Sequence, residues 1–169
     1  MAKKLWGGRF KKKIDPLVEK FTSSIHLDKK LALYDVMGSI LHVAVLKEAG
    51  LISSLEYSKM NKGLNAIFKD IKSDKFKADP KSEDIHSDIQ NKLERMVGKV
   101  AMKLHTARSR NDQVVFDTKL YCKSESEEIA VLLIELNKSI DYFIKKHENA
   151  IVPGYTHLQH AQPVKLASY

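Results

Sequence analysis

Apolar residues recur at helical spacing along most of this 169-residue chain. Over residues 28–49 they follow one another at steps of three to five, which places them roughly on one face of a helix. The residues of this face are Leu31, Val36, Ile40, Val43 and Leu46. Asp28 is a residue type that caps helices, and Gly50 stands where a left-handed carboxyl-terminal cap belongs. The pattern predicts one helix from Asp28 to about Ala49, and Pro16 predicts a shorter helix before it.

Two further helices are predicted by their capping residues and apolar stripes. Ser53, followed three residues later by a glutamate, has the pattern of a capping box. The helix that it opens fades near Ser73, and the polar residues after it predict a loop. Ser82 is then expected to start a third helix that ends at Gly98. The apolar stripe of this helix repeats every four residues, at Ile85, Ile89, Leu93 and Val97.

The longest periodic stretch runs from about Asn111 to His147, and its apolar positions keep a rhythm of three and four residues. A helix of this length would be roughly 55 Å long at a rise of about 1.5 Å per residue. A small domain cannot cover such a helix, so it requires partners in an extended bundle, from this chain or from others. A polar loop is expected at 153–163, and Pro163 has the character of the first residue of another helix.

These elements predict a mostly α fold in two parts. Residues 1–108 are expected to form an amino-terminal helical domain, with an extended arm over residues 1–13. Residues 109–169 are expected to begin a central domain, a bundle of long helices. Because the chain stops at Tyr169, barely one turn into the last expected helix, we expect it to be a segment of a longer protein.

The net charge of +8 and the isoelectric point near 9.4 would suit an acidic partner. Lysine greatly outnumbers arginine, however, and no basic run alternates with aromatic residues as a nucleic-acid groove requires. The charge is therefore interpreted mainly as a solvated surface, and no nucleic acid is expected as a partner. No apolar run reaches about 18 residues, so no membrane-spanning helix is expected. Cys122 is the single cysteine, which excludes an internal disulfide and fits the reducing cytosol.

The polar stretch before the long helix is the first candidate binding site. Within residues 104–113, Ser109, Arg110 and Asn111 stand where the helix is expected to begin. The amino end of a helix presents unpaired N–H groups and partial positive charge, and arginine binds a carboxylate through two hydrogen bonds. The alternative is an ordinary polar helix start, in which Ser109 is the cap and Asp112 lies in the first turn.

The polar loop at 153–163 is the second candidate. In it Thr156 stands beside His157, and a histidine can move protons near neutral pH. Alternatively, His157 and His160 form a His-x-x-His pair for zinc, although no third ligand is near, or each bonds only to the backbone. His86, taken alone, is interpreted as structural. The two candidate loops lie at opposite ends of the long helix, so a shared site would require oligomerisation.

Five stretches of the sequence belong together when they are taken in order. They are LWGGRF near the start, KFTSSI at 20–25, SEDIH at 82–86, KLHTARSRNDQV at 103–114 and PGYTHLQHAQPV at 153–164. In order and spacing they resemble the amino-terminal part of the argininosuccinate lyase family across nearly the whole chain. That family belongs to the fumarase/aspartase superfamily of mostly helical homotetramers. In that superfamily the long helices form a bundle shared between subunits.

The resemblance implies an elimination reaction on argininosuccinate in arginine biosynthesis. A proton leaves the carbon next to a carboxylate, an aci-carboxylate carbanion forms, and the C–N bond breaks to release fumarate and arginine. The resemblance also implies no metal, no organic cofactor, a homotetramer with shared active sites and a cytoplasmic location. By motif match His157 is the acid/base histidine, and Thr156 is catalytic beside it. The implied substrate-binding residues are Ser24, His86, Ser109, Arg110, Asn111 and Thr156.

Two features set the sequence apart from the family pattern. Gln90 stands where many relatives carry a glutamate, which removes a charge that could tune His86. The catalytic serine of the family lies in a downstream loop outside these 169 residues, so the chain alone is expected to be inactive. Three alternatives stay open: a non-catalytic protein resembling the δ-crystallins, another superfamily lyase such as adenylosuccinate lyase, and a basic helical module for nucleic acid.

Overall fold

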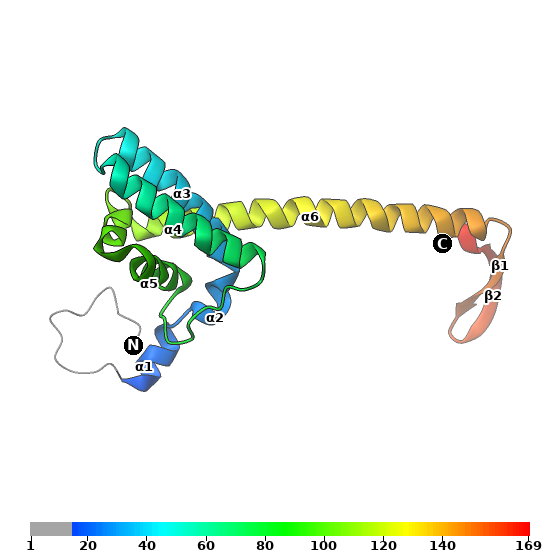
Figure 1. Ribbon diagram of the computed structural model, residues 1–169. Helices are drawn as coiled ribbons and strands as arrows, with labels where there is room; N and C mark the ends of the chain where they lie inside the picture. The colour runs from blue at the N-terminus through cyan, green and yellow to red at the C-terminus, as the bar shows by residue number, and fades with distance from the viewer. Residues whose placement is uncertain (1–14) are drawn as a thin grey trace. The chain divides into compact units, whose positions relative to one another are not determined.

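The computed structural model describes residues 15–169, and this part is mostly helical, which confirms the predicted fold class (Figure 1). The arm predicted over residues 1–13 lies outside the described residues. The chain divides into two compact units, Met1–Cys122 and Lys123–Tyr169, and each is described by itself. The domain boundary predicted after residue 108 falls inside the first unit and stays a prediction.

The first described helix forms where Pro16 predicts it. Helix α1 (Pro16–Thr22) has its proline in the first turn, where the missing N–H group costs nothing. The carboxylate of Asp15 accepts a hydrogen bond from the backbone N–H of Leu17 at 2.8 Å. The short helix predicted after Pro16 is therefore confirmed.

Three helical segments stand where the sequence predicts one helix from Asp28. They are α2 (Ile25–Asp28), the 3-10 helix η1 (Lys29–Leu31) and α3 (Ala32–Glu48). Asp28 ends α2, so its predicted role as the cap of the longer helix is wrong. Its carboxylate instead accepts hydrogen bonds from the Ser24 hydroxyl at 2.6 Å and from the backbone N–H of Ile85 at 3.2 Å. Gly50 after α3 has a φ of 71°, which confirms the left-handed position predicted there.

Helix α4 (Ser54–Lys72) begins with the predicted capping box. The backbone N–H of Glu56 donates to the Ser53 hydroxyl at 3.2 Å, and the Glu56 carboxylate accepts from the backbone N–H of Ser53 at 2.9 Å. Two N–H groups that the helix itself cannot pair are thereby satisfied. The helix also ends near Ser73, as predicted.

Helix α5 (Ile85–Val97) begins later than predicted. Its cap is Asp84, whose carboxylate accepts from the backbone N–H of Ser87 at 2.6 Å, so the predicted start at Ser82 is wrong. Gly98, with a φ of 76°, ends the helix as predicted. The chain then continues as the 3-10 helix η2 (Gly98–His105), whose last two residues fall in the stretch 104–113 that the sequence predicts as a loop.

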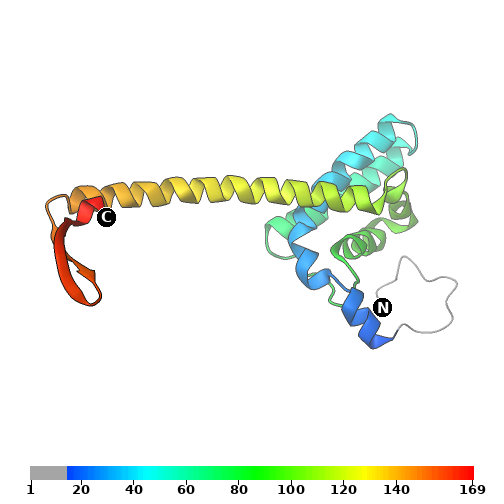
Figure 2. The same cartoon turned by 180° about the vertical axis from the view of Figure 1, so that it is seen from behind.

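The core of the first unit lies between α3, α4 and α5, which pack side by side (Figures 1 and 2). Gly63 of α4 marks a close approach, because a Cβ atom there would lie 2.6 Å from Leu93 Cδ1 of α5. Burial of one aliphatic side chain contributes about 1.5–3 kcal/mol. The predicted stripe of α5 faces this core. Its fully buried members are Ile85, Ile89 and Leu93, and they meet Val36, Val43, Leu46, Met60 and Leu64.

Helix α6 (Arg110–Lys146) is one continuous helix of 37 residues, which confirms the long helix predicted from the apolar rhythm. At its start the Ser109 hydroxyl accepts from the backbone N–H of Asn111 at 3.2 Å. A Cβ atom at Gly38 of α3 would lie 2.9 Å from the Phe116 ring, so a glycine permits this approach of α3 and α6. Further along, large apolar side chains of α6 are about half exposed, namely Ile129, Leu132, Leu136, Ile140 and Phe143.

None of the helices within residues 15–169 combines the length and the apolarity that a membrane span requires.

The second unit ends in a β-hairpin where the sequence predicts a polar loop and a helix from Pro163. Strands β1 (Ile151–Thr156) and β2 (Gln159–Lys165) are antiparallel, and Pro163 lies in β2 opposite Pro153. Both predictions are therefore wrong, and a single 3-10 turn, η3 (Leu166–Ser168), follows the hairpin. Prolines are tolerated here because both strands of a two-stranded sheet are edge strands.

Replacing Ser53 by alanine is expected to lower the free energy of unfolding by about 1 kcal/mol, because the Glu56 N–H group loses its acceptor. Ser54→Ala is the matched control, since it makes the same chemical change one position inside the helix and should have little effect. Urea unfolding followed by circular dichroism measures both. Equal losses in the two variants would contradict the capping role.

Candidate functional site

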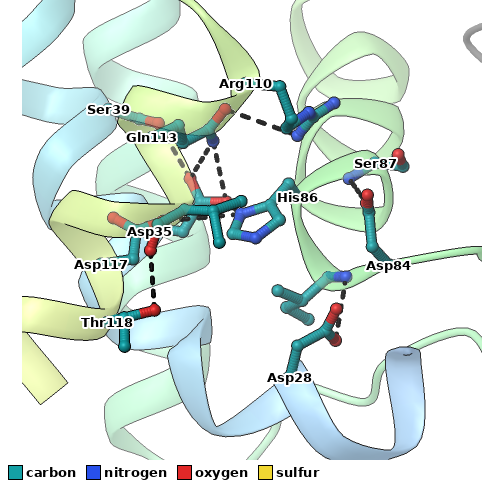
Figure 3. A network of polar contacts seen from close by, with 12 residues as sticks. Asp28, Asp35, Ser39, Asp84, His86, Ser87, Arg110, Gln113, Asp117 and Thr118 are labelled. Carbon is teal, nitrogen blue, oxygen red and sulfur yellow. Dashed lines mark hydrogen bonds and ion pairs between the residues drawn. The ribbon is translucent and has the colours of Figure 1, made fainter.

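Five polar side chains are buried together where α3, α5 and α6 meet (Figure 3). Their exposed fractions are 1% for Asp35, 0% for Ser39, 4% for His86, 5% for Gln113 and 1% for Asp117. Burying polar and charged groups is costly unless they pair with one another. We call this group the buried polar cluster, and its internal bonds determine what it can do.

The carboxylate of Asp35 is the centre of the buried polar cluster. Its Oδ2 atom lies 2.6 Å from His86 Nδ1. The side-chain amide of Gln113 donates to both carboxylate oxygens, at 3.0 and 3.1 Å. The Ser39 hydroxyl, one turn along α3, donates to Oδ1 at 3.0 Å. One carboxylate from α3 thus binds side chains from three helices.

The surroundings of His86 favour its charged form. Burial by itself lowers the pKa of His86, but the hydrogen bond to Asp35 and the charges of Asp35 and Asp84 raise it by more. The positive charge of Arg110 opposes this rise only in part. Because a carboxylate can only accept, the proton of this short contact belongs on Nδ1. The net result is a raised pKa, so the surroundings of His86 favour the imidazolium form beside Asp35.

Asp117 is the second carboxyl group of the cluster. Burial, and then the nearby charge of Asp35, raise its pKa to about 7. Its Oδ2 atom lies 3.5 Å from His86 Nδ1 but finds no hydrogen-bond partner among the described residues. Two carboxylates in one low-dielectric site repel each other, so Asp117 holds a proton well above the usual range of an aspartic acid.

Asp35, His86 and Asp117 could each offer one atom to a metal ion, since these atoms lie within 4.8 Å of one another. A metal would need Nδ1 of His86 without its proton. The short contact with Asp35 favours that proton, and the charge of Arg108 also acts on both carboxyl groups. The negative charge of the cluster is thus already offset by a proton and by arginine, which favours a proton-bearing cluster over a metal site.

The turn of residues 106–110, which we call the cationic turn, leads into α6 beside this cluster. Arg108 donates from its two terminal guanidinium nitrogens to the Ser39 hydroxyl at 3.4 and 3.5 Å. Arg110 donates to the side-chain oxygen of Gln113 at 3.4 Å. Both arginines are half-buried, and burial lowers the pKa of Arg108. Two guanidinium groups are therefore held at the amino end of a long helix, which is a suitable place for an anion.

Two further contacts fix the backbone of the cationic turn. The carbonyl oxygen of Thr106 lies 3.0 Å from Nε2 of His42 on α3, which can donate to it. Ala107 has a φ of 54°, a left-handed conformation that costs a residue with a Cβ atom about 1 kcal/mol or more. The turn is thus held in a specific shape at some cost in stability.

Ser24 lies at the edge of the same region. Its backbone N–H donates to the carbonyl of Glu83 at 2.9 Å, and its hydroxyl donates to Asp28 at 2.6 Å. Asp28 in turn binds the backbone at the start of α5, directly before His86 (Figure 3). The first unit therefore brings Ser24, His86 and Arg110 to one region, with Ser109 and Asn111 exposed on the helix start.

Thr156 and His157 belong to the second unit, and both are exposed in its hairpin. His157 and Leu158 form the two-residue turn, with φ angles of 49° and 63°. The Tyr155 hydroxyl lies 2.6 Å from Nε2 of His160. Among the described residues, the groups of three or more possible metal ligands do not include His157 or His160.

Sequence reasoning missed the central residues of the cluster, Asp35 and Asp117. A signal was present, because Asp35 and Ser39 share a helix face with the buried Val43 and Leu46. A charged residue inside an apolar stripe requires a buried partner, and it marks a site of possible interest. Gln113 and Asp117 are likewise one turn apart, and they are the buried residues of α6 within the described part of the chain.

Comparison with known proteins identifies the family to which this chain belongs. A family model described as lyase matches residues 8–169. Proteins named argininosuccinate lyase are 46% identical over 166 residues in Desulforudis audaxviator, 47% identical over 166 residues in Desulfatibacillum aliphaticivorans and 44% identical over 168 residues in Streptococcus suis. These alignments cover 98 to 99% of this chain. The chain spans 36% of the length of each of these relatives.

Replacing Asp117 by asparagine is expected to stabilise the first unit at pH 8. Its carboxyl group titrates near 3.8 in the unfolded chain and at about 7 in the folded one. The stability that the protonated group contributes is therefore complete below the lower value and is lost as the pH rises through about 7. Asparagine keeps the shape of the protonated acid, and one pKa unit corresponds to about 1.4 kcal/mol, so the gain is on the order of 1 kcal/mol or more.

Urea unfolding at pH 4, 6 and 8 measures this effect, and the difference between Asp117→Asn and the wild type should shrink toward pH 4. Asp112→Asn is the control, because that residue is exposed in the first turn of the same helix. An Asp117→Asn variant that is less stable at pH 8 than at pH 4, relative to the wild type, would contradict the raised pKa.

Replacing Ala107 by glycine is expected to raise the free energy of unfolding by about 1 kcal/mol, because glycine adopts the left-handed conformation without strain. Ala101→Gly is the control: this alanine is fully buried in η2, and the substitution there should destabilise. Thermal unfolding distinguishes the two directions. A loss in both variants would show that the turn carries no such strain.

Proposed function

Because this chain belongs to the lyase family, we propose that its residues serve an argininosuccinate lyase, an enzyme that splits argininosuccinate into fumarate and arginine, although the chain alone is expected to be inactive. The relatives that match 98% of the chain carry this name. The observation that carries the proposal is the cationic turn, where Arg108 and Arg110 are held at the start of α6 by buried partners. The HTARSRND stretch forms this turn, and it favours argininosuccinate over the substrates of other lyases in the superfamily.

The proposed substrate carries a succinyl group with two carboxylates, and one of them gains charge as the proton leaves the neighbouring carbon. Donors that are already in place stabilise such developing charge without reorganisation. Arg110, the exposed side chains of Ser109 and Asn111, and the amino end of α6 supply donors and positive potential. We propose that they bind the succinyl group and stabilise the aci-carboxylate.

Ser24 and His86 are proposed as further substrate-binding residues. Ser24 is half-buried next to Asp28, and His86 lies one residue beyond the α5 backbone group that Asp28 binds. The raised pKa of His86 favours its charged form, which adds positive potential to the region that would receive the dianion. Its side chain is 4% exposed, so we expect that contribution to be mainly electrostatic.

His157 is proposed to move the proton, with Thr156 binding the substrate beside it. Because these residues belong to the second unit, we propose that they complete the site of a neighbouring copy in a homotetramer. The half-exposed apolar residues of α6 support this assembly, since other helices of a bundle would cover them. The single cysteine, Cys122, fits the cytoplasm as the proposed location.

A chimera tests the proposed activity. This chain replaces the matching 166 residues in the argininosuccinate lyase of Desulforudis audaxviator, and the ultraviolet absorbance of fumarate follows turnover of argininosuccinate. The chimera is expected to release fumarate. His157→Asn and Asn111→Ala should each lower kcat/KM by about 100-fold or more, as loss of a proton-transfer group or a charge-stabilising donor does.

Asn65→Ala in the chimera is the control, because this asparagine is exposed on α4. It should leave turnover unchanged. A chimera that assembles with the size and helix content of the parent enzyme but releases no fumarate would overturn the proposal. Full activity in the His157→Asn variant would overturn the role of that histidine.

A further inference from the structure

Three cationic side chains converge on one carboxylate in the first unit. His86 binds Asp35 directly at 2.6 Å. Arg110 reaches it through Gln113, and Arg108 reaches it through Ser39. Asp35 comes from α3, far from these residues in the sequence, and it is only 1% exposed. A ligand of the cationic turn would therefore not touch Asp35, although each of the three cations depends on it.

The link from Asp35 to Arg110 runs through Gln113 and has a fixed direction. The amide group of Gln113 donates to both oxygens of Asp35, at 3.0 and 3.1 Å, so its carbonyl oxygen must point the opposite way. That oxygen accepts from Arg110 at 3.4 Å. Gln113 is buried and has no freedom to flip without losing both bonds to Asp35. The orientation of the Asp35 carboxylate is thus passed on to the guanidinium of Arg110.

The link from Asp35 to Arg108 runs through Ser39 and is fixed in the same manner. The hydroxyl has one hydrogen, which it donates to Asp35 at 3.0 Å, and its lone pairs are left to accept from Arg108. Nε of Arg108 is buried and finds no hydrogen-bond partner among the described residues. Ser39 therefore provides the hydrogen bond that fixes the outer end of this side chain on the α3 side.

Asp117 provides an internal comparison, because it resembles Asp35 in burial and in its charge partners. It lies 3.5 Å from His86, and its free oxygen accepts no hydrogen bond from the described residues. Among the described residues, Gln113 and Ser39 donate to Asp35 and not to Asp117. Hydrogen bonding therefore gives the positioning role to Asp35 and not to Asp117, although both carboxyl groups lie near His86.

We propose that Asp35 is the positioning residue of the cationic turn, orienting Arg110 through Gln113 and Arg108 through Ser39 before any carboxylate ligand binds. This inference rests on the proposed function for the identity of the ligand, a dicarboxylate, but not for the contacts. An arginine that is already oriented loses less side-chain entropy on binding. Asp35 acts through its partners, so it is not a catalytic residue.

The test compares Asp35→Asn with Asp117→Asn in the 169-residue chain by NMR. The first readout, taken without ligand, is the side-chain amide signal of Gln113 together with the Nε–H signals of Arg108 and Arg110. Asp35→Asn is expected to shift the Gln113 signal and to broaden the arginine signals, since an asparagine accepts with one oxygen only. Asp117→Asn is expected to leave them near their wild-type positions.

The second readout is the affinity for succinate, followed through the backbone N–H of Asn111. Asp35→Asn is expected to weaken succinate binding by about tenfold, the effect of losing one well-placed interaction with a charged group. Asp117→Asn is expected to change it less than about twofold. Should Asp35→Asn fail to fold, Ser39→Ala removes only the link from Asp35 to Arg108. It should broaden the Nε–H signal of Arg108 and leave that of Arg110 sharp.

The outcomes separate this inference from the proposed function. If the wild-type chain binds no succinate, the dicarboxylate assignment loses its support, while the Gln113 and arginine signals still decide the role of Asp35. If Asp35→Asn leaves those signals unchanged, the positioning role is overturned even where succinate binds. Equal effects of the two aspartate variants on the arginine signals would also overturn it, because the hydrogen bonds that only Asp35 accepts from Gln113 and Ser39 would then not explain the arrangement.

Discussion

The first unit depends on the short contact between the carboxylate of Asp35 and the ring of His86. It joins α3 to α5 inside the core, and Gln113 brings α6 to the same carboxylate. A buried carboxylate without partners would be strongly destabilising, so the three helices must meet in one register for the core to close. Apolar packing gives the helices a common interior, but this polar contact selects the arrangement that also presents the cationic turn.

Much of the helical layout was predictable from local sequence, because caps and apolar stripes act over one or two turns. Ser53, Gly50 and the stripe of α5 were all predicted in this way and confirmed. The start at Asp28 was not, since its carboxylate binds Ile85, a residue far away in the sequence. Local reasoning could see that Asp28 is a capping residue type, but not that a distant helix would use it.

The residues of the candidate site likewise fall into those that local sequence predicts and those that depend on packing between distant helices. Polar residues mark the start of a helix in a sequence. This signal was sufficient to select Ser109, Arg110 and Asn111. Asp35 and Asp117 could not be paired with His86, because contact between separate helices depends on their packing. The hairpin was missed because its turn, His157 and Leu158, lacks the glycine or asparagine that usually marks left-handed positions.

Gly38 determines how closely α3 and α6 can approach each other at the buried polar cluster. It precedes Ser39 on α3, and it faces Phe116, the residue before Asp117 on α6. A larger residue there would displace the Phe116 ring or the helix beside it at the level of the cluster, since its Cβ atom would stand 2.9 Å from the ring. A gap opened by that displacement would admit water, and hydration would raise the local dielectric constant and weaken each charged contact. The absence of a side chain at Gly38 thus allows the close approach of α3 and α6 that encloses the cluster.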